Sequence, residues 1–221
     1  MGTISAIIPT RGYIVASCIE SVLDNLKDMD YRIVFSKGHS IPDCFTIPIR
    51  DELRFGANYI WLVEEDVEVP RYGLQSLLAA DYDISAIDYP FPNGVGCAAY
   101  HKGKPLWCGT GCTLIKRRVF DGVWQPWFRT DVDYIINDDG TFTENEGVLN
   151  KYGGHDIYFC LKARRLGFTL GVVPNITARH FKIKKMGEAG VNNGAHEFTV
   201  YDHIKKINVM KGDPLDSDIF S

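Results

Sequence analysis

The sequence predicts a single α/β domain, with a mainly parallel, Rossmann-like sheet flanked by helices. Short apolar runs alternate with segments of helical periodicity, and the links between them are short. The run YIWLV (59–63) is continuously apolar, which is typical of a parallel strand covered on both faces. The chain has 221 residues, 45% hydrophobic and 24% charged, which suits one globular domain and excludes collagen-like, coiled-coil and disordered classes.

The first half of the chain is the regular part. Short apolar runs predict strands at 4–11, 31–35, 59–63 and 84–88. Apolar residues at helical spacing predict helices at 14–26, 50–57 and 71–80. Residues 36–48 contain Gly38, Pro42 and Pro48, so we expect a loop there.

The second half is less regular. The remaining expected elements are a hairpin within 90–105, a strand at 111–116, a short helix from 117 to 121, a helix at 156–166 and a strand at 168–174. Residues 124–150 show no period and are expected to be irregular. The domain is expected to span 1–181. Residues 182–221 would form a C-terminal lid or tail packed on it, with a Gly-rich lid at 182–198.

Charge and cysteine usage narrow the class of protein. The formal charge of -4 gives no overall attraction to nucleic acid or anionic lipid. None of the six cysteines forms a C-x-x-C pair, so we expect buried thiols in a reducing compartment and no structural zinc. No signal peptide or membrane-spanning run is found, which predicts a cytoplasmic protein that meets a membrane only through its acceptor.

Three acidic residues, Glu64, Glu65 and Asp66, directly follow the run YIWLV. Ligands of open parallel sheets bind beyond the carboxyl ends of the strands, where this cluster is expected to lie. If the strand continues, Glu64 and Asp66 point to one side and Glu65 to the other. Hard oxygen ligands suit Mg²⁺ or Mn²⁺ on a phosphate, and the alternative is a solvated strand end.

Five segments in chain order resemble GT-A glycosyltransferases, especially those similar to glycosyltransferase family 2. They are IIPTRG (7–12), WLVEEDVEVP (61–70), WCGTGCTLIKRRVFD (107–121), GGHDIYFCLKARRLGF (153–168) and ARHF (178–181). The resemblance implies a GT-A fold, a nucleotide-sugar donor of UDP or GDP type, and Mn²⁺ or Mg²⁺. It also implies a hydroxyl acceptor, which could be a glycan, a lipid-linked sugar or a small molecule.

The sequence departs from the family pattern at three places. The D-x-D equivalent begins with Glu64, so Asp66 is the safer metal ligand, with Glu64 second. His155 replaces the usual Glu before the catalytic Asp. Ser36 to His39 contain no Asp of the kind that holds the nucleoside, so the base stays open.

Donor-binding candidates follow the first strand and the later glycines. The resemblance assigns this role to Thr10, Arg11, Arg50, Glu65, Gly109 and Thr110. A hydroxyl and a guanidinium suit a diphosphate, although Thr10 and Arg11 also fit a simple turn and Arg50 also fits a surface arginine. Gly109 and Gly111 would let a ligand approach the backbone closely, and a β-bulge explains them equally.

Asp156 is the candidate catalytic base. An inverting sugar transfer needs one carboxylate to take the proton of the acceptor hydroxyl. Asp156 follows two glycines at an expected helix start, so its alternative role is an N-cap. In a retaining enzyme it would position the donor sugar instead. His155 is an acceptor-site candidate or a loop residue.

His180 and the aromatic residues complete the candidate site. His180 could finish the metal shell, with Lys182, Lys184 and Lys185 closing over phosphates, or these residues form a solvated face. Trp107 is a sugar-binding candidate, because indoles pack on sugar rings. Trp124, Trp127 and Phe128 fit either a sugar site or the core.

Two rival functions remain open. A nucleotidyltransferase also uses an α/β sheet, a divalent ion and a nucleotide, but PTRGYIVAS (9–17) contains one glycine where a Gly-rich loop is expected. A non-catalytic relative that binds nucleotide or carbohydrate is the second rival. The sequence does not give the oligomeric state, the sugar or the acceptor.

Overall fold

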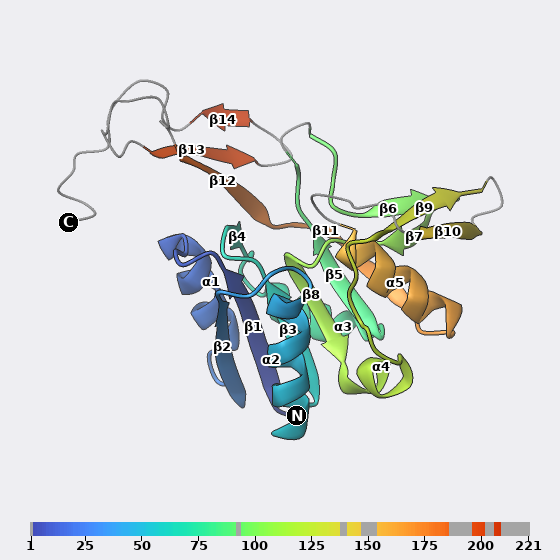
Figure 1. Cartoon of the computed structure of the whole chain (residues 1–221). Helices are drawn as coiled ribbons and strands as arrows, with labels where there is room; N and C mark the ends of the chain where they lie inside the picture. The colour runs from blue at the N-terminus through green and yellow to red at the C-terminus, as the bar shows by residue number, and fades with distance from the viewer. Residues whose placement is uncertain are drawn as a thin grey trace.

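A computed structural model describes residues 2–91, 94–137, 141–146, 154–185, 196–201 and 206–208. Figure 1 shows a central sheet with helices on both sides, and strands of the second half of the chain projecting above it.

The central sheet has six strands in the order β11-β5-β8-β3-β1-β2. Their bounds are β1 Ile4–Thr10, β2 Tyr31–Lys37, β3 Tyr59–Val63, β5 Ile84–Asp88, β8 Cys112–Lys116 and β11 Leu170–Thr177. β8 runs antiparallel to both of its neighbours, β3 and β5, and the other pairs are parallel. The expected mainly parallel α/β sheet is confirmed, and its one reversed strand is the predicted strand 111–116.

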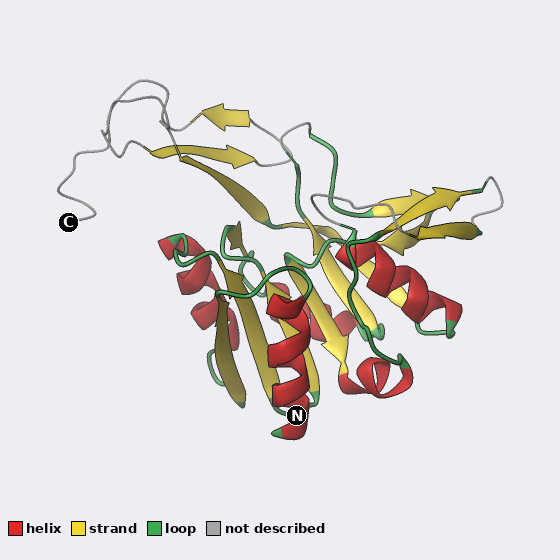
Figure 2. Cartoon of the chain, in the orientation of Figure 1, coloured by secondary structure: helices red, strands yellow, loops and turns green. Residues whose placement is uncertain are grey.

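Helices cover both faces of this sheet, as Figure 2 shows in red. Their bounds are α1 Ala16–Leu26, α2 Asp43–Arg54, α3 Gly73–Ala80, α4 Arg117–Gly122 and α5 His155–Arg165. Alternate residues of β3 pack in two separate hydrophobic cores. Ile60 and Leu62 lie in the core that includes residues of α2, α4 and α5. Trp61 and Val63 lie in the core of α1 and α3. This alternation explains why the run 59–63 is apolar at every position.

Smaller sheets complete the fold. β12 (Arg179–Lys185) pairs antiparallel with β4 (Val67–Glu68) and with β13 (His196–Tyr201), which pairs with β14 (Lys206–Asn208). The pairs β6 (Ala99–His101) with β7 (Lys104–Trp107), and β9 (Val132–Ile136) with β10 (Phe142–Glu146), are antiparallel. The first of these is the hairpin expected within 90–105.

The predicted start of the second helix is wrong. α2 begins at Asp43 and includes Pro48, whereas the sequence predicted a loop up to 48 and a helix over 50–57. Proline normally disfavours a helix interior. Here, however, Phe45, Ile49 and Leu53 recur every four residues and bury one face of the helix, so tertiary packing outweighs the proline.

The irregular segment predicted over 124–150 is also wrong in part, because it contains the β9–β10 hairpin. Tyr134 and Phe142 pack edge to face across these strands, with ring centroids 5.8 Å apart. The expected boundary between 181 and 182 falls inside β12. Most of the expected lid over 182–198, namely 186–195, lies outside the described residues.

Two expectations about the environment can be compared with the structure. All six cysteines are buried and form no disulfide, as the sequence predicted. Within the ranges given above, no helix has the length and apolar character needed to cross a bilayer.

Candidate metal and donor site

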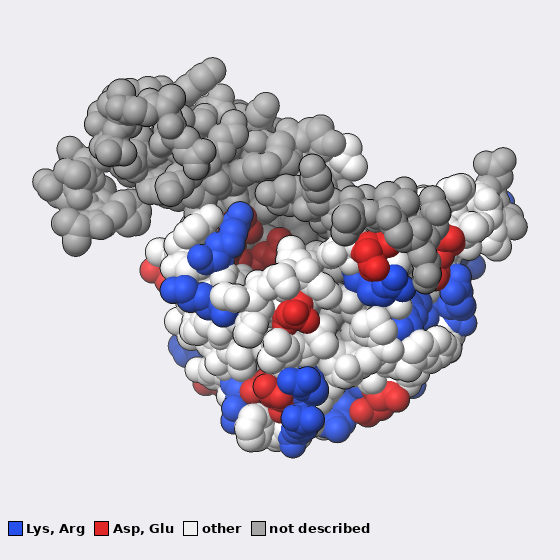
Figure 3. Space-filling view, in the orientation of Figure 1, with Lys and Arg blue, Asp and Glu red and all other residues white. Residues whose placement is uncertain are grey.

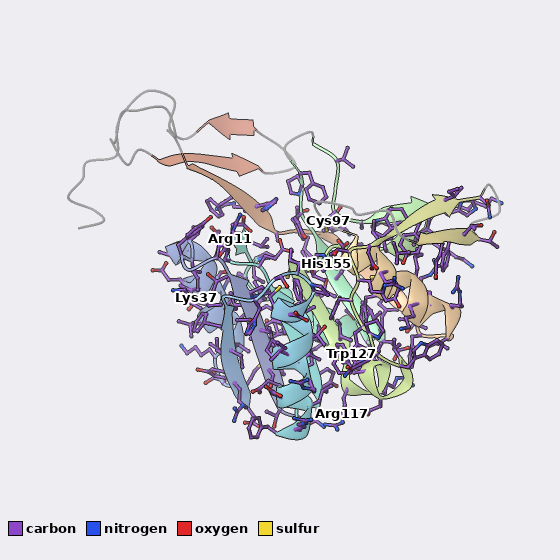
Figure 4. All side chains as sticks on the ribbon, in the orientation of Figure 1. Arg11, Lys37, Cys97, Arg117, Trp127 and His155 are labelled. Carbon is purple, nitrogen blue, oxygen red and sulfur yellow. The ribbon has the colours of Figure 1, made fainter. Side chains whose placement is uncertain are left out.

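The candidate site lies at the carboxyl ends of β1 and β3. Thr10 ends β1, and Glu64, Glu65 and Asp66 follow β3, which pairs in parallel with β1. The two segments are therefore neighbours at the same edge of the sheet, as predicted. Figure 3 shows acidic atoms next to Lys and Arg atoms at this upper edge, and Figure 4 places the Arg11 and His155 labels there.

Glu64, Asp66 and His180 form an acidic and imidazole cluster. Each offers one ligand atom, and these three atoms lie within 4.8 Å of one another. The Nε2 atom of His180 is 3.6 Å from Oδ1 of Asp66. The structure thus brings together the three residues that the sequence proposed as metal ligands.

Strand pairing explains how His180 reaches the cluster. His180 pairs with Val67 where β12 runs antiparallel to β4, directly after Asp66. The backbone N–H of Phe181 donates to the carbonyl of Asp66 at 2.7 Å. The backbone therefore fixes the separation of the two segments before any side chain interacts.

The orientation of the His180 ring is also fixed. Its Nδ1–H donates to the carbonyl of Pro90 at 3.3 Å, so Nε2 faces Asp66. The ring of Tyr89 packs edge to face on it, with centroids 5.3 Å apart. A backbone partner on one ring nitrogen is the usual way to present the other nitrogen to a metal.

Charge is concentrated in this cluster. Burial, together with the nearby carboxylates of Asp66 and Asp156, raises the pKa of Glu64 to about 7, although His180 and the hydrogen bond from Thr110 act in the opposite direction. Burial alone would lower the pKa of His180, but its hydrogen bond and charge interaction with Asp66 outweigh burial, so the pKa is raised. The free protein therefore holds protons in the cluster near neutral pH.

The donor set fits a hard divalent cation. Carboxylate oxygens are the ligands preferred by Mg²⁺ and Mn²⁺, and one imidazole is compatible with Mn²⁺. Glu64, Asp66 and His180 could hold such an ion through one atom each.

Glu65 binds Arg11, which also lies near Asp66, and the strand alternation expected for residues 64–66 does not apply because β3 ends at Val63. Glu65 is 4% exposed, and its carboxylate accepts from the backbone N–H of Arg11 at 2.8 Å and from the Arg11 guanidinium. Its carbonyl accepts from the N–H of Val15 at 3.1 Å. Glu65 therefore holds the turn between β1 and α1.

The β1–α1 turn presents one cation to the site. The side chain of Arg11 is 62% exposed, and its Nη2 lies 3.5 Å from Oδ2 of Asp66. The hydroxyl of Thr10 donates to the carbonyl of Tyr13 at 2.9 Å and accepts from the N–H of Gly12 at 3.0 Å. Thr10 thus closes the turn, and Arg11 is the group available to an incoming anion.

Tyr89 fills the space that the glycines were expected to offer a ligand. A Cβ on Gly111 would lie 2.7 Å from the phenol oxygen of Tyr89, and a Cβ on Gly109 would meet the same oxygen. The N–H of Gly111 also donates to this oxygen at 3.1 Å. A buried ring of the protein itself explains both glycines.

Thr110 lies between these glycines and links two parts of the site. Its hydroxyl donates to Oε1 of Glu64 at 3.2 Å and is 3.2 Å from Nε2 of His155. His155 is the first residue of α5, is 6% exposed and stacks on Phe45 with ring centroids 4.8 Å apart. His155 is thus a buried residue of the helix start, and the loop alternative is wrong.

Asp156 is the second residue of α5, so the N-cap prediction is wrong. The cap position is Gly154, in the left-handed conformation with φ 85°, and no side chain in the described part of the chain caps this end. Oδ1 of Asp156 accepts from the N–H of Ile157 at 2.8 Å. An acid in the first helical turn is stabilised by the helix dipole. Asp156 also lies close enough to Glu64 to raise its pKa.

The remaining candidates have partners elsewhere in the fold. Arg50 is on α2, where its guanidinium is 3.5 Å from the Asp51 carboxylate. Trp107 ends β7 and packs against the core. Trp127 and Phe128 are buried in that core, so the packing alternative is right for them. Trp124 is 63% exposed, with Lys162 over its ring at 4.9 Å. In Figure 4 the Trp127 label lies toward the opposite end of the sheet from Arg11.

Sequence reasoning missed Tyr89 and Phe45. The ring of Tyr89 packs on His180, and the ring of Phe45 stacks on His155. Tyr89 directly follows β5, at the same edge of the sheet as Asp66, so its position was a usable signal. Phe45 lies in the stretch that was predicted to be a loop, so no signal was available for it.

Comparison with known proteins shows a likeness in fold alone. No family model matches the sequence, and no curated protein matches it. Among solved structures, the chain is similar to A197 from STIV, with a TM-score of 0.56 and 19% sequence identity, over 82% of this chain and 86% of that one. The protein is therefore an α/β protein with a mainly parallel six-stranded sheet, and a likeness at this identity extends no further than the fold.

Proposed function

We propose that this protein is a metal-dependent glycosyltransferase of GT-A type that moves a sugar from a nucleotide-diphospho-sugar to an acceptor hydroxyl. The observation that carries the proposal is the convergence of Glu64, Asp66 and His180 at the carboxyl edge of the sheet, beside the exposed Arg11. These residues come from three of the segments that resemble GT-A enzymes. A site of this charge and position suits a diphosphate held through a cation.

The chemistry needs charge neutralisation on the leaving group. Glu64, Asp66 and His180 would hold Mn²⁺ or Mg²⁺, which would supply Lewis-acid stabilisation of the departing diphosphate. The Arg11 guanidinium pairs with Asp66 in the free protein, and its exposure lets it move to a phosphate oxygen. Thr10 and Glu65 keep the turn that carries Arg11 in place.

Asp156 is the proposed base. As the acceptor oxygen forms its bond to the anomeric carbon, a carboxylate oxygen of Asp156 takes the hydroxyl proton, and the bond to the diphosphate breaks. Oδ1 is held by the N–H of Ile157, and no described residue donates a hydrogen bond to Oδ2. This geometry leaves one oxygen for an acceptor. The reaction would then invert the anomeric configuration.

The decisive experiment is incubation with a panel of nucleotide sugars and Mn²⁺, followed by measurement of the nucleoside diphosphate released. Slow hydrolysis of one donor, lost on chelation and in Asp66→Ala, supports the proposal. Asp121→Asn, an exposed carboxylate of α4, is the matched control and should retain hydrolysis. Release of pyrophosphate from a nucleoside triphosphate would identify a nucleotidyltransferase. Binding of donor with no product would identify a non-catalytic relative.

A further inference from the structure

Thr110 stands between two groups that come from distant parts of the chain. Glu64 follows β3, Thr110 lies in the turn before β8, and His155 begins α5. The Thr110 hydroxyl is 3.2 Å from Oε1 of Glu64 and 3.2 Å from Nε2 of His155. A backbone hydrogen bond joins the segments of Glu64 and Thr110 as well, because the N–H of Glu64 donates to the carbonyl of Gly111 at 3.1 Å.

The number of protons fixes the direction of these hydrogen bonds. A threonine hydroxyl has one proton, and an ionised carboxylate can only accept. With Glu64 ionised, Thr110 therefore donates to Glu64 and accepts from His155, whose Nε2 must carry the proton. The Nδ1 atom of His155 is then a bare acceptor, and it is buried with no hydrogen-bond partner among the described residues.

Packing keeps the imidazole in this orientation. His155 stacks on Phe45, and Phe128 lies at a centroid distance of 6.1 Å on a tilted plane. Burial lowers the pKa of His155 although the adjacent Asp156 acts in the opposite direction, so the ring is neutral. A neutral ring held by aromatic residues is a rigid donor to Thr110.

The hydrogen bonds of Thr110 orient both Glu64 and the start of α5. Oε1 of Glu64 is held by Thr110, and among the described residues nothing else donates to this carboxylate. The second carboxylate oxygen of Glu64 is therefore available to a cation in the site. His155 precedes Asp156, so the same hydroxyl also fixes the start of α5.

We propose that Thr110 is a positioning residue. Its hydroxyl orients the carboxylate of Glu64 for the cation and, through His155, fixes the position of Glu64 relative to Asp156. This inference rests on the proposed function for the role of Asp156, but its effect on cation binding does not require turnover. Residues that orient metal ligands typically change metal affinity by roughly 10–100-fold when they are lost.

The test compares two variants of Thr110 with a control, Thr113, in the strand that follows the turn. Thr110→Val keeps the shape and removes the hydroxyl, whereas Thr110→Ser keeps the hydroxyl. Thr113→Val is the matched control, because the Thr113 hydroxyl donates to the carbonyl of Gly109 and not to Glu64. Mn²⁺ dissociation constants are measured on the apo protein from the EPR signal of free Mn²⁺, and kcat and KM are measured for the donor that is turned over.

We expect Thr110→Val to weaken Mn²⁺ binding about tenfold or more and to lower kcat, and Thr110→Ser to recover most of both. Unchanged Mn²⁺ binding in Thr110→Val would overturn the proposal, as would equal weakening in Thr113→Val or no recovery in Thr110→Ser. If Mn²⁺ binding behaves as expected but no nucleotide sugar is consumed, the positioning role stands and glycosyl transfer fails.

A second measurement reads the tautomer of His155 in the wild-type protein and does not depend on any variant of Thr110. Long-range ¹H–¹⁵N spectra at pH 8, with the His155 signal assigned by its loss in His155→Gln, report which ring nitrogen carries the proton. A proton on Nε2 and a bare Nδ1 support the proposal. A proton on Nδ1 would contradict it even if Thr110→Val did not fold.

Discussion

The Nε2 atom of His180 lies 3.6 Å from Oδ1 of Asp66, and this contact joins two distant parts of the chain. It exists because β12 pairs with β4 one residue beyond Asp66, and because Pro90 holds the other ring nitrogen of His180. The contact places an imidazole nitrogen beside the carboxylates of Glu64 and Asp66 at this edge of the sheet. A cation at this edge would find ligands of two kinds.

Removal of Asp66 is expected to abolish stabilisation by metal. Mn²⁺ with a nucleoside diphosphate at about 100 times its dissociation constant should stabilise the protein by about 2.7 kcal/mol, or roughly 5–10 °C in Tm. Asp66→Ala should lose this metal-dependent shift and keep an apo Tm near that of wild type. Differential scanning fluorimetry with and without Mn²⁺ measures both. Glu68→Gln, next to the cluster, is the control, and a full shift in Asp66→Ala would show that the acidic residues are a solvated strand end.

Cation affinity is expected to rise with pH through neutrality. Glu64, with a pKa of about 7, must be ionised to bind a cation, and His180, whose pKa is raised, must lose its proton from Nε2. Below its pKa each group weakens binding by roughly tenfold per pH unit. The Mn²⁺ dissociation constant should therefore fall steeply between pH 6 and pH 8. Glu64→Gln should bind more weakly and with a shallower slope, and an affinity independent of pH in wild type would contradict the assignment.

Loss of Asp156 is expected to affect the chemical step alone. General-base assistance contributes about 10²–10⁴-fold, or roughly 3–5 kcal/mol. Asp156→Asn keeps the size of the side chain and its oxygen for the N–H of Ile157, so α5 should remain intact. Transfer to acceptor should fall by that factor while Mn²⁺ affinity changes little. Near-normal transfer in this variant would show that Asp156 is not the base, and the anomeric configuration of the product, read by NMR, separates inversion from retention.

Stability is expected to depend on Asp83, which lies outside the site. Asp83 is 2% exposed and accepts from the N–H and the hydroxyl of Thr169 at 2.9 Å each, and from the Arg118 guanidinium. Burial alone would raise the pKa of Asp83, but these hydrogen bonds outweigh it and hold the pKa below 3.8. Asp83→Asn should lower the free energy of unfolding by about 1–3 kcal/mol at pH 7.

The pH dependence of this effect has a definite sign. A depressed native pKa stabilises the fold above the unfolded-state pKa, and this contribution is lost as the pH falls through the native value. The difference between wild type and Asp83→Asn should therefore shrink below pH 3.8. Urea unfolding at pH 7 and in acid measures it, with Asp121→Asn as the exposed control. An equal difference at both pH values would mean that the carboxylate charge does not contribute.

The strands of the central sheet could be predicted because their apolar runs are short and sharply bounded. The direction of β8 could not, because a buried strand reads alike in both directions. α2 was placed too late because Pro48 outweighed the spacing of Phe45, Ile49 and Leu53 in the prediction, whereas packing decides in the protein.

The candidate site was predictable where it depends on strand ends. Asp66 and His180 lie at the expected edge of the sheet. The different partners of Glu64 and Glu65 did not follow from strand alternation, because β3 ends at Val63. Side-chain contacts between segments were not predictable. The ring of Tyr89 over Gly109, for example, depends on the reversed strand β8, which periodicity does not reveal.

The pairing of β4 with β12 has a thermodynamic consequence. His180 reaches the cluster through two residue pairs, Arg179 with Glu68 and His180 with Val67. Because binding equilibria are reciprocal, a cation that draws on His180 must favour this pairing, and the pairing must in turn favour the cation by the same factor. A chain shortened before Arg179 would keep the six strands of the central sheet and lose the nitrogen ligand. Cation capture is thus coupled to the pairing of β4 with β12, a part of the fold that lies outside the central sheet.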